Sequence, residues 1–533
     1  MNTKALKQKI LDLAIHGKLL PLEKVEQIRK EEPASKLLEK IRAEKQEKIA
    51  KGELKKDKND SFIFVVDDKR HYEKFADGSV KDIEDEIPFD VPDGWAVARM
   101  GTYITFTGGA QPPKETFEYS PNENNIRLIQ IRDYKTNDFV NYIPKNLARR
   151  FCSKTDVMIG RYGPPLFQIL RGIEGAYNVA LMKAEAIPEI MQNNYLYYML
   201  QDRTLLHFLE SLSDRTCGQD GVNMFELNNY LILIPPYEEQ TIIIKKLEET
   251  FPLINTLAEN INDLNVSIKQ AKSKILDLAI HGKLVPQDPN DESASVLLEK
   301  IRAEKEAKIA KGELKRDKND SYIYKGSDNC HYQKNADGSI ANIEDEIPFE
   351  VPEGWSWVRL SLLGEYKKGP FGSALTKSMF VPKAETTIKV YEQKNAIHKN
   401  SSLGDYYISK EYFETKMKSF EVFPGDIIVS CAGTIGETYI LPKNIERGII
   451  NQALMRMKIT DKINIGYFLM FFDHILKDES AKSGKGTAIK NIPPFDVFKQ
   501  FLFPLPPLTE QTRIVAKIEE LFTLLDNIQN NLI

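Results

Sequence analysis

Residues 483–487 read SGKGT and contain the glycine–lysine pair with which phosphate-binding loops hold a nucleotide. Such a loop also needs a glycine five positions before the pair and a serine or threonine directly after the lysine. Glu479 and Gly486 occupy those two positions. The stretch therefore predicts an ordinary loop and not a nucleotide site.

Residues 491–495 read NIPPF, which is similar to the Asn-Pro-Pro-aromatic motif of amino-methyltransferases. Ile492 interrupts the motif, and no glycine-rich cofactor loop precedes it. Carboxylates are abundant along the chain but form no recognisable acid–base pair. We expect no methyl-transfer site and no hydrolytic site in this chain.

Histidine and cysteine give no stronger signal. His16–Gly17 and His281–Gly282 each follow a helical pattern, and glycine suits the left-handed position after a helix. A capping dipeptide is therefore the simpler interpretation, with a catalytic histidine as the alternative. The cysteines are far apart and form no CxxC pair, so we predict neither a zinc site nor a disulfide framework. They are Cys152, Cys217, Cys330 and Cys431.

The composition is that of a globular protein without a membrane span. The chain has 533 residues, of which 42% are hydrophobic and 28% charged, and its net charge is −4. No run of about 18 apolar residues occurs, and the N-terminus reads as an amphipathic helix without a signal-peptide pattern. We expect a cytoplasmic protein with two to four domains and no contact with a membrane.

The chain is a tandem repeat, and the repeat decides its domain organisation. The offset between copies is 265 for the first block and 260 for the others, so copy 1 has a five-residue insertion near residues 22–32. The blocks that return are 9–19 at 274–284, 37–45 at 297–305, 51–61 at 311–321 and 71–95 at 331–355.

A weaker match joins residues 234–249 to residues 505–520 and contains Pro-Pro-x-x-Glu-Gln in both copies. The segments between the repeated blocks, 96–236 and 356–507, are only distantly alike. Both look strand-rich with short helices, and they align with Asp156 against Asp426 and Asn178 against Asn451. The repeating unit is thus a constant block, a variable domain and a helix, used twice.

A long helix near the middle of the chain has the apolar spacing of a coiled coil, alternating three and four residues. The same spacing continues at both termini. We infer that the central helix lies antiparallel to a composite rod made from the two terminal helices; core helices of a helical domain are the alternative. Pro252 should kink or interrupt the rod. The predicted seam is Leu247, Ile254, Leu257, Ile261, Leu264, Ile268, Ile275, Leu278, Ile518, Leu521, Leu525 and Ile528.

The predicted fold is α+β: two mixed α/β domains separated by long antiparallel coiled-coil helices, with circular pseudo-two-fold symmetry. Residues 34–55 and 294–315 read as solvated helices, with an interaction face for another subunit as the alternative. The expected parts are an N-terminal conserved region (1–95), a first variable domain (96–236), a central conserved region with the long helix (237–355), a second variable domain (356–507) and a C-terminal helix (508–533).

This organisation resembles the specificity subunits of Type I restriction-modification systems. The resemblance covers the whole length and rests on the repeated constant blocks, on the IPFxVPxGW segments ending at Trp95 and Trp355, on GDIIVSCAGTIG at 425–436, and on the duplicated Pro-Pro-x-x-Glu-Gln signature. The first variable domain has KTDVMIGRYGPP where the second has the GDIIVSCAGTIG pattern.

The resemblance implies a non-catalytic subunit whose two variable domains are target-recognition domains. Each would read one half of a bipartite site in double-stranded DNA, and the helices would set the unread spacer. Two methyltransferase subunits and the restriction (motor) subunits are the implied partners. The chain itself would need no cofactor, whereas the complex would use S-adenosylmethionine, ATP and Mg.

DNA contact needs lysine and arginine for phosphates and forked or amide side chains for base edges. Residues 356–507 hold 21 Lys and Arg against 15 Asp and Glu, whereas residues 96–236 hold 14 of each. For each candidate a solvated surface residue is the alternative, and for Asn178 and Asn451 a turn. The candidates are Gln111, Lys114, Arg132, Arg161, Tyr162, Asn178, Arg215, Gln219, Asn223, Lys367, Lys377, Lys394, Asn395, Ser430, Asn451, Gln452, Lys485, Thr487 and Lys490.

Two hypotheses of other classes compete with a DNA reader. One is a coiled-coil scaffold that binds only proteins, and the other is an enzyme whose motifs are unrecognised. Two divergent domains on duplicated supports favour the reader, because a scaffold has no need to diversify them.

Overall fold

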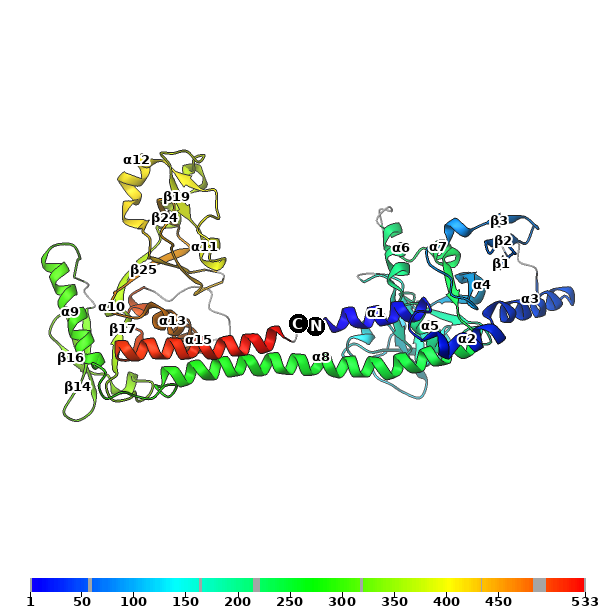
Figure 1. Cartoon of the computed structure of the whole chain (residues 1–533), viewed down its shortest axis with the longest axis horizontal. Helices are drawn as coiled ribbons and strands as arrows, with labels where there is room; N and C mark the ends of the chain where they lie inside the picture. Colours follow the sequence, from blue (N-terminus) through cyan, green and yellow to red (C-terminus); the bar gives the residue numbers. More distant parts are fainter. Residues whose placement is uncertain are drawn as a thin grey trace. The chain divides into compact units, whose positions relative to one another are not determined.

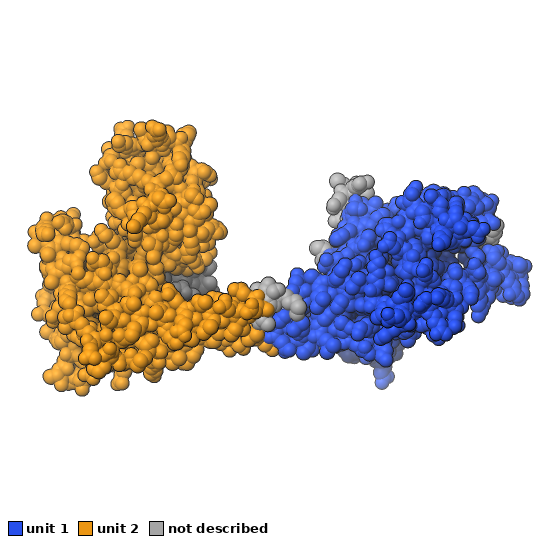
Figure 2. All heavy atoms as spheres, in the orientation of Figure 1, with its two compact units in different colours: residues 1–262 blue, residues 263–533 orange. Residues whose placement is uncertain are grey.

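The computed structural model describes residues 2–55, 60–162, 165–213, 221–316, 320–432, 434–482 and 495–531. The chain forms two compact units, residues 1–262 and 263–533, which Figure 2 shows in different colours. Each unit contains helices and β-sheets, so the predicted α+β class is confirmed. The two units repeat one order of elements, as the sequence repeat predicted.

Each constant block ends in a helix and a three-stranded antiparallel sheet (Figure 1). Only copy 1 has a helix in the inserted segment; residues 281–293 of copy 2 form turns. The elements of copy 1 are α1 (Thr3–Ile15), α2 (Leu22–Glu31), α3 (Ala34–Ala50), β1 (Ser61–Val65), β2 (His71–Phe75), β3 (Val80–Asp82) and η1 (Glu84–Glu86). Those of copy 2 are α9 (Ala294–Ala310), β14 (Ser321–Lys325), β15 (His331–Asn335), β16 (Ile340–Asn342) and η5 (Glu344–Glu346).

The His–Gly pairs end their helices, as predicted. The His16 and His281 rings approach the carbonyl oxygens one turn back, with Nδ1 at 2.8 Å from Asp12 O and 2.7 Å from Asp277 O. The glycine that follows each histidine is left-handed, with φ of +68° in copy 1 and +65° in copy 2. These dipeptides are helix caps, because both the ring and the glycine serve the last helical turn.

The first variable domain, a recognition domain by the resemblance, contains two four-stranded sheets, in the orders β10-β9-β12-β5 and β7-β6-β11-β8, and the pair β13-β4. Its elements are β4 (Ala96–Arg99), α4 (Met100–Tyr103), β5 (Ile104–Gly108), η2 (Lys114–Thr116), β6 (Asn125–Ile129), η3 (Ile131–Tyr134), β7 (Asn141–Pro144), η4 (Lys145–Leu147), β8 (Phe151–Cys152), β9 (Val157–Gly160), β10 (Gln168–Arg171), β11 (Gly175–Tyr177), β12 (Leu181–Ala186), α5 (Asn193–Met199), α6 (Arg203–Ser213), α7 (Met224–Asn229) and β13 (Leu231–Ile234).

The second recognition domain has the same topology, with sheets β18-β25-β22-β23 and β20-β19-β24-β21 and the pair β17-β26. Its elements are β17 (Ser356–Arg359), α10 (Leu360–Leu363), β18 (Gly364–Lys368), η6 (Gly372–Ala374), η7 (Lys377–Met379), β19 (Ile388–Tyr391), α11 (Gln393–Ile397), β20 (Tyr407–Ile408), α12 (Lys410–Tyr412), η8 (Phe413–Met417), η9 (Lys418–Phe420), β21 (Glu421–Val422), β22 (Ile427–Ser430), β23 (Thr438–Ile440), β24 (Gly448–Ile450), β25 (Leu454–Ile459), α13 (Ile465–Lys482), α14 (Phe495–Phe498) and β26 (Leu502–Leu505).

Residues that the sequence alignment pairs between the two domains make the same side-chain hydrogen bonds. Asp156 Oδ2 accepts a hydrogen bond from Ser153 N at 2.7 Å, and Asp426 Oδ2 accepts one from Phe423 N at 2.9 Å. Each aspartate therefore closes the turn that leads into the central strand of its sheet, β9 or β22. The shared fold of the two variable domains, predicted from the sequence, is confirmed.

The long central helix is α8 (Tyr237–Ile280), and it continues through Pro252. The expectation that this proline interrupts the helix is wrong: the side chain of Pro252 is exposed and the helix persists on both sides of it. The predicted seam positions on α8, from Leu247 to Leu278, are all buried or half-buried. The burial of these positions agrees with the three- and four-residue spacing predicted for the seam on this helix.

Within each unit a terminal helix runs antiparallel along α8 (Figure 1). In unit 1, α1 packs its Leu11 into the core that contains Leu247, and Lys7 hydrogen-bonds Asn255. In unit 2 the partner helix is α15 (Leu508–Asn530). Its antiparallel course follows from the ion pair between Lys272 and Asp526 and from the hydrogen bond between Asn265 and Gln529.

One seam prediction on α15 is wrong. Ile528 is 47% exposed, and the next residue faces α8 instead, with Gln529 Nε2 donating to Asn265 Oδ1 at 3.0 Å. From the buried Ile518 to Gln529 is eleven residues, which is three turns of an ordinary α-helix. A strict seven-residue pattern drifts by about 20° per heptad against such a helix, so its last predicted position turns away from the partner.

A buried glutamate in the first turn of α8 holds the constant block of unit 1. Glu239 is fully buried, and Trp95 Nε1 donates a hydrogen bond to its Oε2 at 3.0 Å. Arg29, from the inserted helix α2, makes a two-pronged ion pair with the same carboxylate at 2.6 and 2.9 Å. Trp95 is thus the packing anchor that the sequence predicted, with Glu239 as its partner.

The neighbouring glutamine holds the recognition domain. Gln240 Nε2 donates to Ile190 O at 2.8 Å, and its Oε1 accepts from Gln192 N at 2.8 Å. Both partners lie just before α5 in the recognition domain. The Glu-Gln pair of the signature therefore ties the constant block and the recognition domain to one turn of one helix.

Unit 2 has the same junction with a different partner for the glutamate. Trp355 Nε1 donates to Glu510 Oε2 at 2.9 Å, but a neutral side chain, Gln287, donates to Oε1 at 2.7 Å. Gln511 Oε1 accepts from Asn464 N at 2.9 Å. Without the two-pronged arginine of unit 1, burial raises the pKa of the Glu510 carboxyl above its ordinary value of 4.5.

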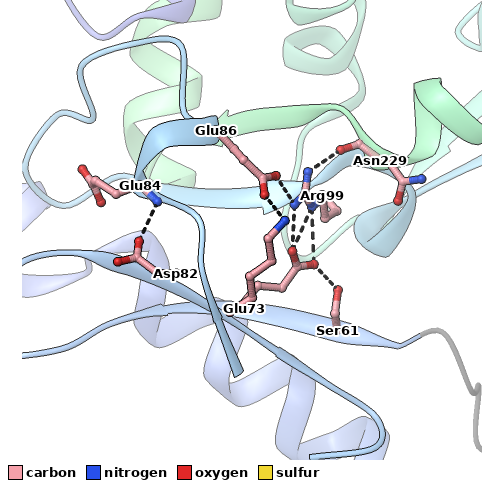
Figure 3. Close-up of polar contacts among 8 residues, drawn as sticks. Ser61, Glu73, Asp82, Glu84, Glu86, Arg99 and Asn229 are labelled. Carbon is pink, nitrogen blue, oxygen red and sulfur yellow. Dashed lines mark hydrogen bonds and ion pairs between the residues drawn. The ribbon is translucent and has the colours of Figure 1, made fainter. Parts of the chain in front are cut away.

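An arginine at the end of β4 fixes the small sheet of the constant block to the recognition domain (Figure 3). Arg99 Nη2 donates to Glu73 Oε2 at 2.8 Å and to Glu86 Oε2 at 2.7 Å, while its Nη1 donates to Asn229 O at 2.9 Å. Ser61 Oγ donates to the other oxygen of Glu73 at 2.6 Å. The small sheet, β4 and the segment before β13 are thereby held together.

Arg359 repeats this network in unit 2. Its Nη2 donates to Glu346 Oε2 at 2.6 Å, and its Nε donates to the neutral Gln333 Oε1 at 2.8 Å where unit 1 has Glu73. Unit 2 therefore keeps the geometry of both junctions with one buried charge fewer in each.

We expect Glu239→Gln and Glu510→Gln to differ sharply. Glu239→Gln leaves the buried Arg29 without its counter-charge and should cost unit 1 about 3–5 kcal/mol of unfolding free energy at neutral pH. Glu510 has a raised pKa in the folded state. The unfolding free energy that it contributes when protonated is therefore present below pH 4.5 and is lost as the pH rises through the folded-state pKa. Glu510→Gln lacks that loss, and its stability relative to the parent chain should therefore improve from pH 4.5 to 8.

Hydrogen exchange of β13 and β26 measures the opening of each unit separately, with exposed Glu238→Gln as the matched control. Equal effects of the two buried substitutions at every pH would contradict the assigned partners.

Candidate nucleic-acid interface

Loops of each recognition domain gather at one end of its larger sheet. In the first domain, Gly108 ends β5 and Gly160 ends β9. Both pair with the first residues of β12, which lies between these strands. In the second, β18 and β22 end beside the start of β25 in the same way. We call the loops at these ends the strand-end surfaces: residues 109–113, 130–134, 161–162 and 178–180 in the first domain, and 369–373, 392–397, 431–432 and 451–453 in the second.

The predicted asparagines are the turn residues of these surfaces. Asn178 Oδ1 accepts from Ala180 N at 3.2 Å, and Asn451 Oδ1 accepts from Ala453 N at 3.0 Å. Their carbonyl oxygens abut the loop that follows β5 or β18: a Cβ would lie 2.0 Å from Asn178 O at Gly109 and 1.8 Å from Asn451 O at Gly369. The asparagines therefore position the loop, and glycine is required where the loop passes them.

A short capped helix lies beside that turn in each domain. The caps are reciprocal side-chain and backbone hydrogen bonds between Gln130 and Asp133 in the first domain and between Glu392 and Asn395 in the second. Asn395 is fully buried, and its Nδ2 donates to two carbonyl oxygens within the loop at 2.8 and 2.9 Å. The prediction that Asn395 contacts DNA is therefore wrong, because its amide is consumed by the cap.

In each domain a cation directly precedes the second residue of the cap, Asp133 or Asn395. Arg132 is exposed, with its guanidinium 5.7 Å from the Phe139 ring centre and its Nη2 donating to Phe139 O at 3.3 Å. Lys394 occupies the same place in the second domain. Its ion pair with Glu392, at 2.9 Å, raises the pKa of the lysine, so it remains charged at neutral pH. Arg132 and Lys394 thus supply equivalent positive charges.

A second cation sits at the end of the sheet in both domains but comes from different strands. Arg161 follows β9, and its Nη1 lies 3.3 Å from the Cβ position of Gly108 at the end of β5. In the second domain Cys431 stands in place of Arg161, with matching backbone hydrogen bonds of 2.9 Å to the turn before β12 or β25. Lys368 stands in place of Gly108. Arginine and glycine in one domain have become cysteine and lysine in the other.

The charge of Lys368 acts at the place that Arg161 fills. Burial raises the pKa of the Cys431 thiol to about 12, and the nearby Lys368 ammonium opposes that rise. Each domain therefore keeps one positive charge where β5 or β18 meets the loop after the central strand.

Several other candidates are exposed or half-buried at or near the strand-end surfaces. Tyr162 is 40% exposed and lies under the Arg161 guanidinium at 5.3 Å. Lys367 is half-buried, with its ammonium 4.8 Å from the Phe420 ring centre. The remaining exposed candidates are Gln111, Lys114, Lys377 and Gln452. These residues stay predicted contacts.

Two further candidates have structural roles, and some lie outside the described ranges. Ser430 is fully buried and accepts a hydrogen bond from Glu437 N at 3.0 Å, so its prediction as a contact is wrong. Asn223 caps α7 by accepting from Phe225 N at 3.1 Å. Outside the described residues are Arg215, Gln219, Lys485, Thr487 and Lys490, together with the SGKGT stretch and most of NIPPF.

Sequence reasoning missed two residues of the second domain, Lys368 and Phe371. Phe371 is 89% exposed on the loop after β18, where the first domain has Gln111. Its position between Pro370 and Gly372 was a usable signal, because an aromatic residue inside turn chemistry has no strand or helix face to bury it. The role of Lys368 emerges only when the two domains are superposed strand by strand.

The described residues offer no alternative chemistry at these surfaces. Burial raises the pKa of the Cys152 thiol to about 11, so Cys152, like Cys431, is protonated and unreactive at neutral pH. Among the described residues, no three His, Cys, Asp or Glu side chains converge as a metal site. None of the helices in these ranges has both the length and the apolar character that crossing a bilayer requires. Exposed cations, amides and aromatic rings suit contact with a polyanion that carries stacked bases.

Comparisons with known proteins agree with this chemistry. Residues 352–533 match the family model described as a Type I restriction modification DNA specificity domain. The chain is 25% identical to the Type I restriction enzyme EcoEI specificity subunit of Escherichia coli, over 99% of this chain and 90% of that protein. It is also 25% identical to the EcoAI specificity subunit of Escherichia coli, over 97% of this chain and 88% of that protein.

The fold also matches a solved chain. That solved chain belongs to a structure described as "Structural basis underlying complex assembly and conformational transition of the type I R-M system". The match has a TM-score of 0.52 and 15% identity, and covers 84% of this chain and 94% of that one. At this identity the likeness concerns the fold alone.

Proposed function

The chain belongs to the specificity subunits of Type I restriction-modification systems, and from this premise we propose that its two recognition domains read the two halves of a bipartite site in double-stranded DNA. Each domain would do so through its strand-end surface. The loop after β5 or β18 would enter a groove, and the cations beside it would bind the flanking phosphates. The chain would act as a non-catalytic reader.

One observation supports this proposal above the others: the exchange of Arg161 and Gly108 for Cys431 and Lys368 between the domains. A solvated surface charge has no reason to stay in place while its strand of origin changes. A phosphate held at that place gives such a reason, because either cation can neutralise it. A scaffold that binds only proteins would have no use for cationic surfaces that differ in detail.

The duplicated constant blocks suit identical partners. Their near-identical sequences present one surface twice, which fits two copies of a methyltransferase subunit, one for each unit. Restriction (motor) subunits would complete a complex that methylates and cleaves DNA, with S-adenosylmethionine, ATP and Mg bound by those partners. Such a complex would act in the cytoplasm.

We expect the chain, assembled with its methyltransferase partner, to shift a duplex that contains its site in an electrophoretic mobility assay. Mapping methylated bases across the host genome should reveal two short motifs separated by an unread spacer. A continuous motif, or binding that does not depend on sequence, would sink the proposal.

Arg161→Gln and Lys368→Gln should each weaken DNA binding and reduce the slope of log affinity against log salt by about one. The matched controls are Lys154→Gln and Lys443→Gln, exposed lysines at the opposite end of the same sheets. Affinity measured from 50 to 200 mM salt should change little in the controls. Unchanged slopes in both test variants would show that these cations do not bind phosphates.

The length of α8 should set the unread spacer. Seven residues inserted between Ile261 and Leu264 keep the seam in register and lengthen the helix by about 10 Å. The spacer should grow by about three base pairs, because base pairs stack at about 3.4 Å, while both half-sites stay the same. Methylation mapping measures this directly, with an insertion of equal length at the exposed Pro289 as the control. An unaltered spacer in the helix variant would contradict this role for α8.

A further inference from the structure

Phe371 has the highest exposed fraction among the large apolar side chains of the described residues, at 89%. Burial of apolar surface is favourable, so a side chain this open gains little from its own domain and would gain most of that free energy from a partner. Single exposed apolar residues are common on proteins and carry no meaning alone. The meaning of Phe371 lies in how its loop is held and in what surrounds it.

The loop is fixed on both sides of Phe371. Before it, Gly369 N donates to Leu454 O at 2.9 Å, and the backbone of Gly369 lies too close to Asn451 O for any side chain. After it, Phe371 O accepts from Ala374 N at 2.8 Å, and Leu375 is buried in the core beside β19. The phenylalanine is therefore presented by a braced loop.

Positive charge lies on both sides of the ring along the chain. Lys368 precedes it and Lys377 follows it, both exposed, and the domain from 356 to 507 holds 21 Lys and Arg against 15 Asp and Glu. A purely apolar groove on a protein partner would not favour positive charges on both sides of the ring. DNA offers both features at once, because the phosphates of its two strands flank a stack of apolar base faces.

The first domain gives a contrast at the same position. Gln111 stands where the second domain has Phe371, three residues after Gly108 as Phe371 is three after Lys368, and its side-chain amide donates to its own loop at Pro112 O, 3.2 Å away. An amide can hydrogen-bond a base edge within an undistorted groove. A phenyl ring makes no such bond, so the two domains meet DNA at this loop by different physical means.

We infer that Phe371 is an apolar wedge that inserts between two base pairs of the half-site read by the second domain. Insertion unstacks one base step and kinks the duplex, and the free energy that this requires favours easily unstacked steps such as TA or CA. Phe371 is thus a specificity-determining residue that reads deformability, whereas Gln111 reads an edge. This inference rests on the proposed function and adds the means of recognition to it.

The test uses the full chain in complex with its methyltransferase partner and a duplex carrying 2-aminopurine at adenine positions of the half-site read by the second domain, one at a time. The methylated adenine is left unlabelled, because its flipping would give its own signal. We expect binding to raise the fluorescence at one step. Phe371→Ala should abolish that rise and weaken binding about tenfold, in line with about 1–3 kcal/mol per stacked base, while Phe371→Trp should restore both.

Phe423→Ala is the matched control, since Phe423 is another exposed phenylalanine of the second domain, at 52%. It should leave fluorescence and affinity unchanged. Sequence-specific binding by the parent complex without any fluorescence rise would overturn the wedge and leave the DNA-reading function intact. Loss of partner assembly in Phe371→Ala would overturn it in favour of a protein contact, and absence of sequence-specific binding by the parent complex would overturn both proposals.

Discussion

A buried glutamate in the first turn of each long helix is the contact on which the rest of the architecture depends. Glu239 and Glu510 accept the indole hydrogen of Trp95 and Trp355 inside the protein, where an unmade hydrogen bond is expensive. The glutamine that follows each of them binds the recognition domain. Constant block, recognition domain and helix therefore meet within one helical turn, and the position of each strand-end surface along its helix is set there.

The two junctions solve one electrostatic problem in different ways. Burying a carboxylate costs several kcal/mol unless a cation or several donors satisfy it. Copy 1 supplies a cation, Arg29, from α2, the helix that only copy 1 has and in whose region its five extra residues lie. Copy 2 supplies neutral donors, Trp355 and Gln287, and burial raises the pKa of its glutamate despite them. This helix, an irregularity in the repeat, is thus the source of an ion pair at the centre of unit 1.

Periodic and duplicated features were predictable because they depend on local rules. The heptad seam followed from apolar spacing, the helix ends from His–Gly, and the shared fold of the recognition domains from their aligned strands. The contact residues were less predictable, because polarity in a loop does not reveal exposure. The side chains of Asn395 and Ser430 make their hydrogen bonds inside the domain. Phe371 was missed for a different reason: the candidates were chosen for cationic, forked or amide side chains, and only the structure shows that this apolar ring is exposed.

The comparison of the two domains also explains why a residue-by-residue alignment understates what they share. What is kept at the end of the sheet is a positive charge at one place, supplied by the central strand in the first domain and by the edge strand in the second. An alignment scores Arg161 against Cys431 and Gly108 against Lys368 as two losses. In space they are one conserved charge, since β5 and β9 end on either side of the same strand, β12, and the Arg161 side chain reaches the end of β5. Divergence of sequence under a fixed electrostatic constraint is what a polyanion common to both domains, with different bases in each half-site, would produce.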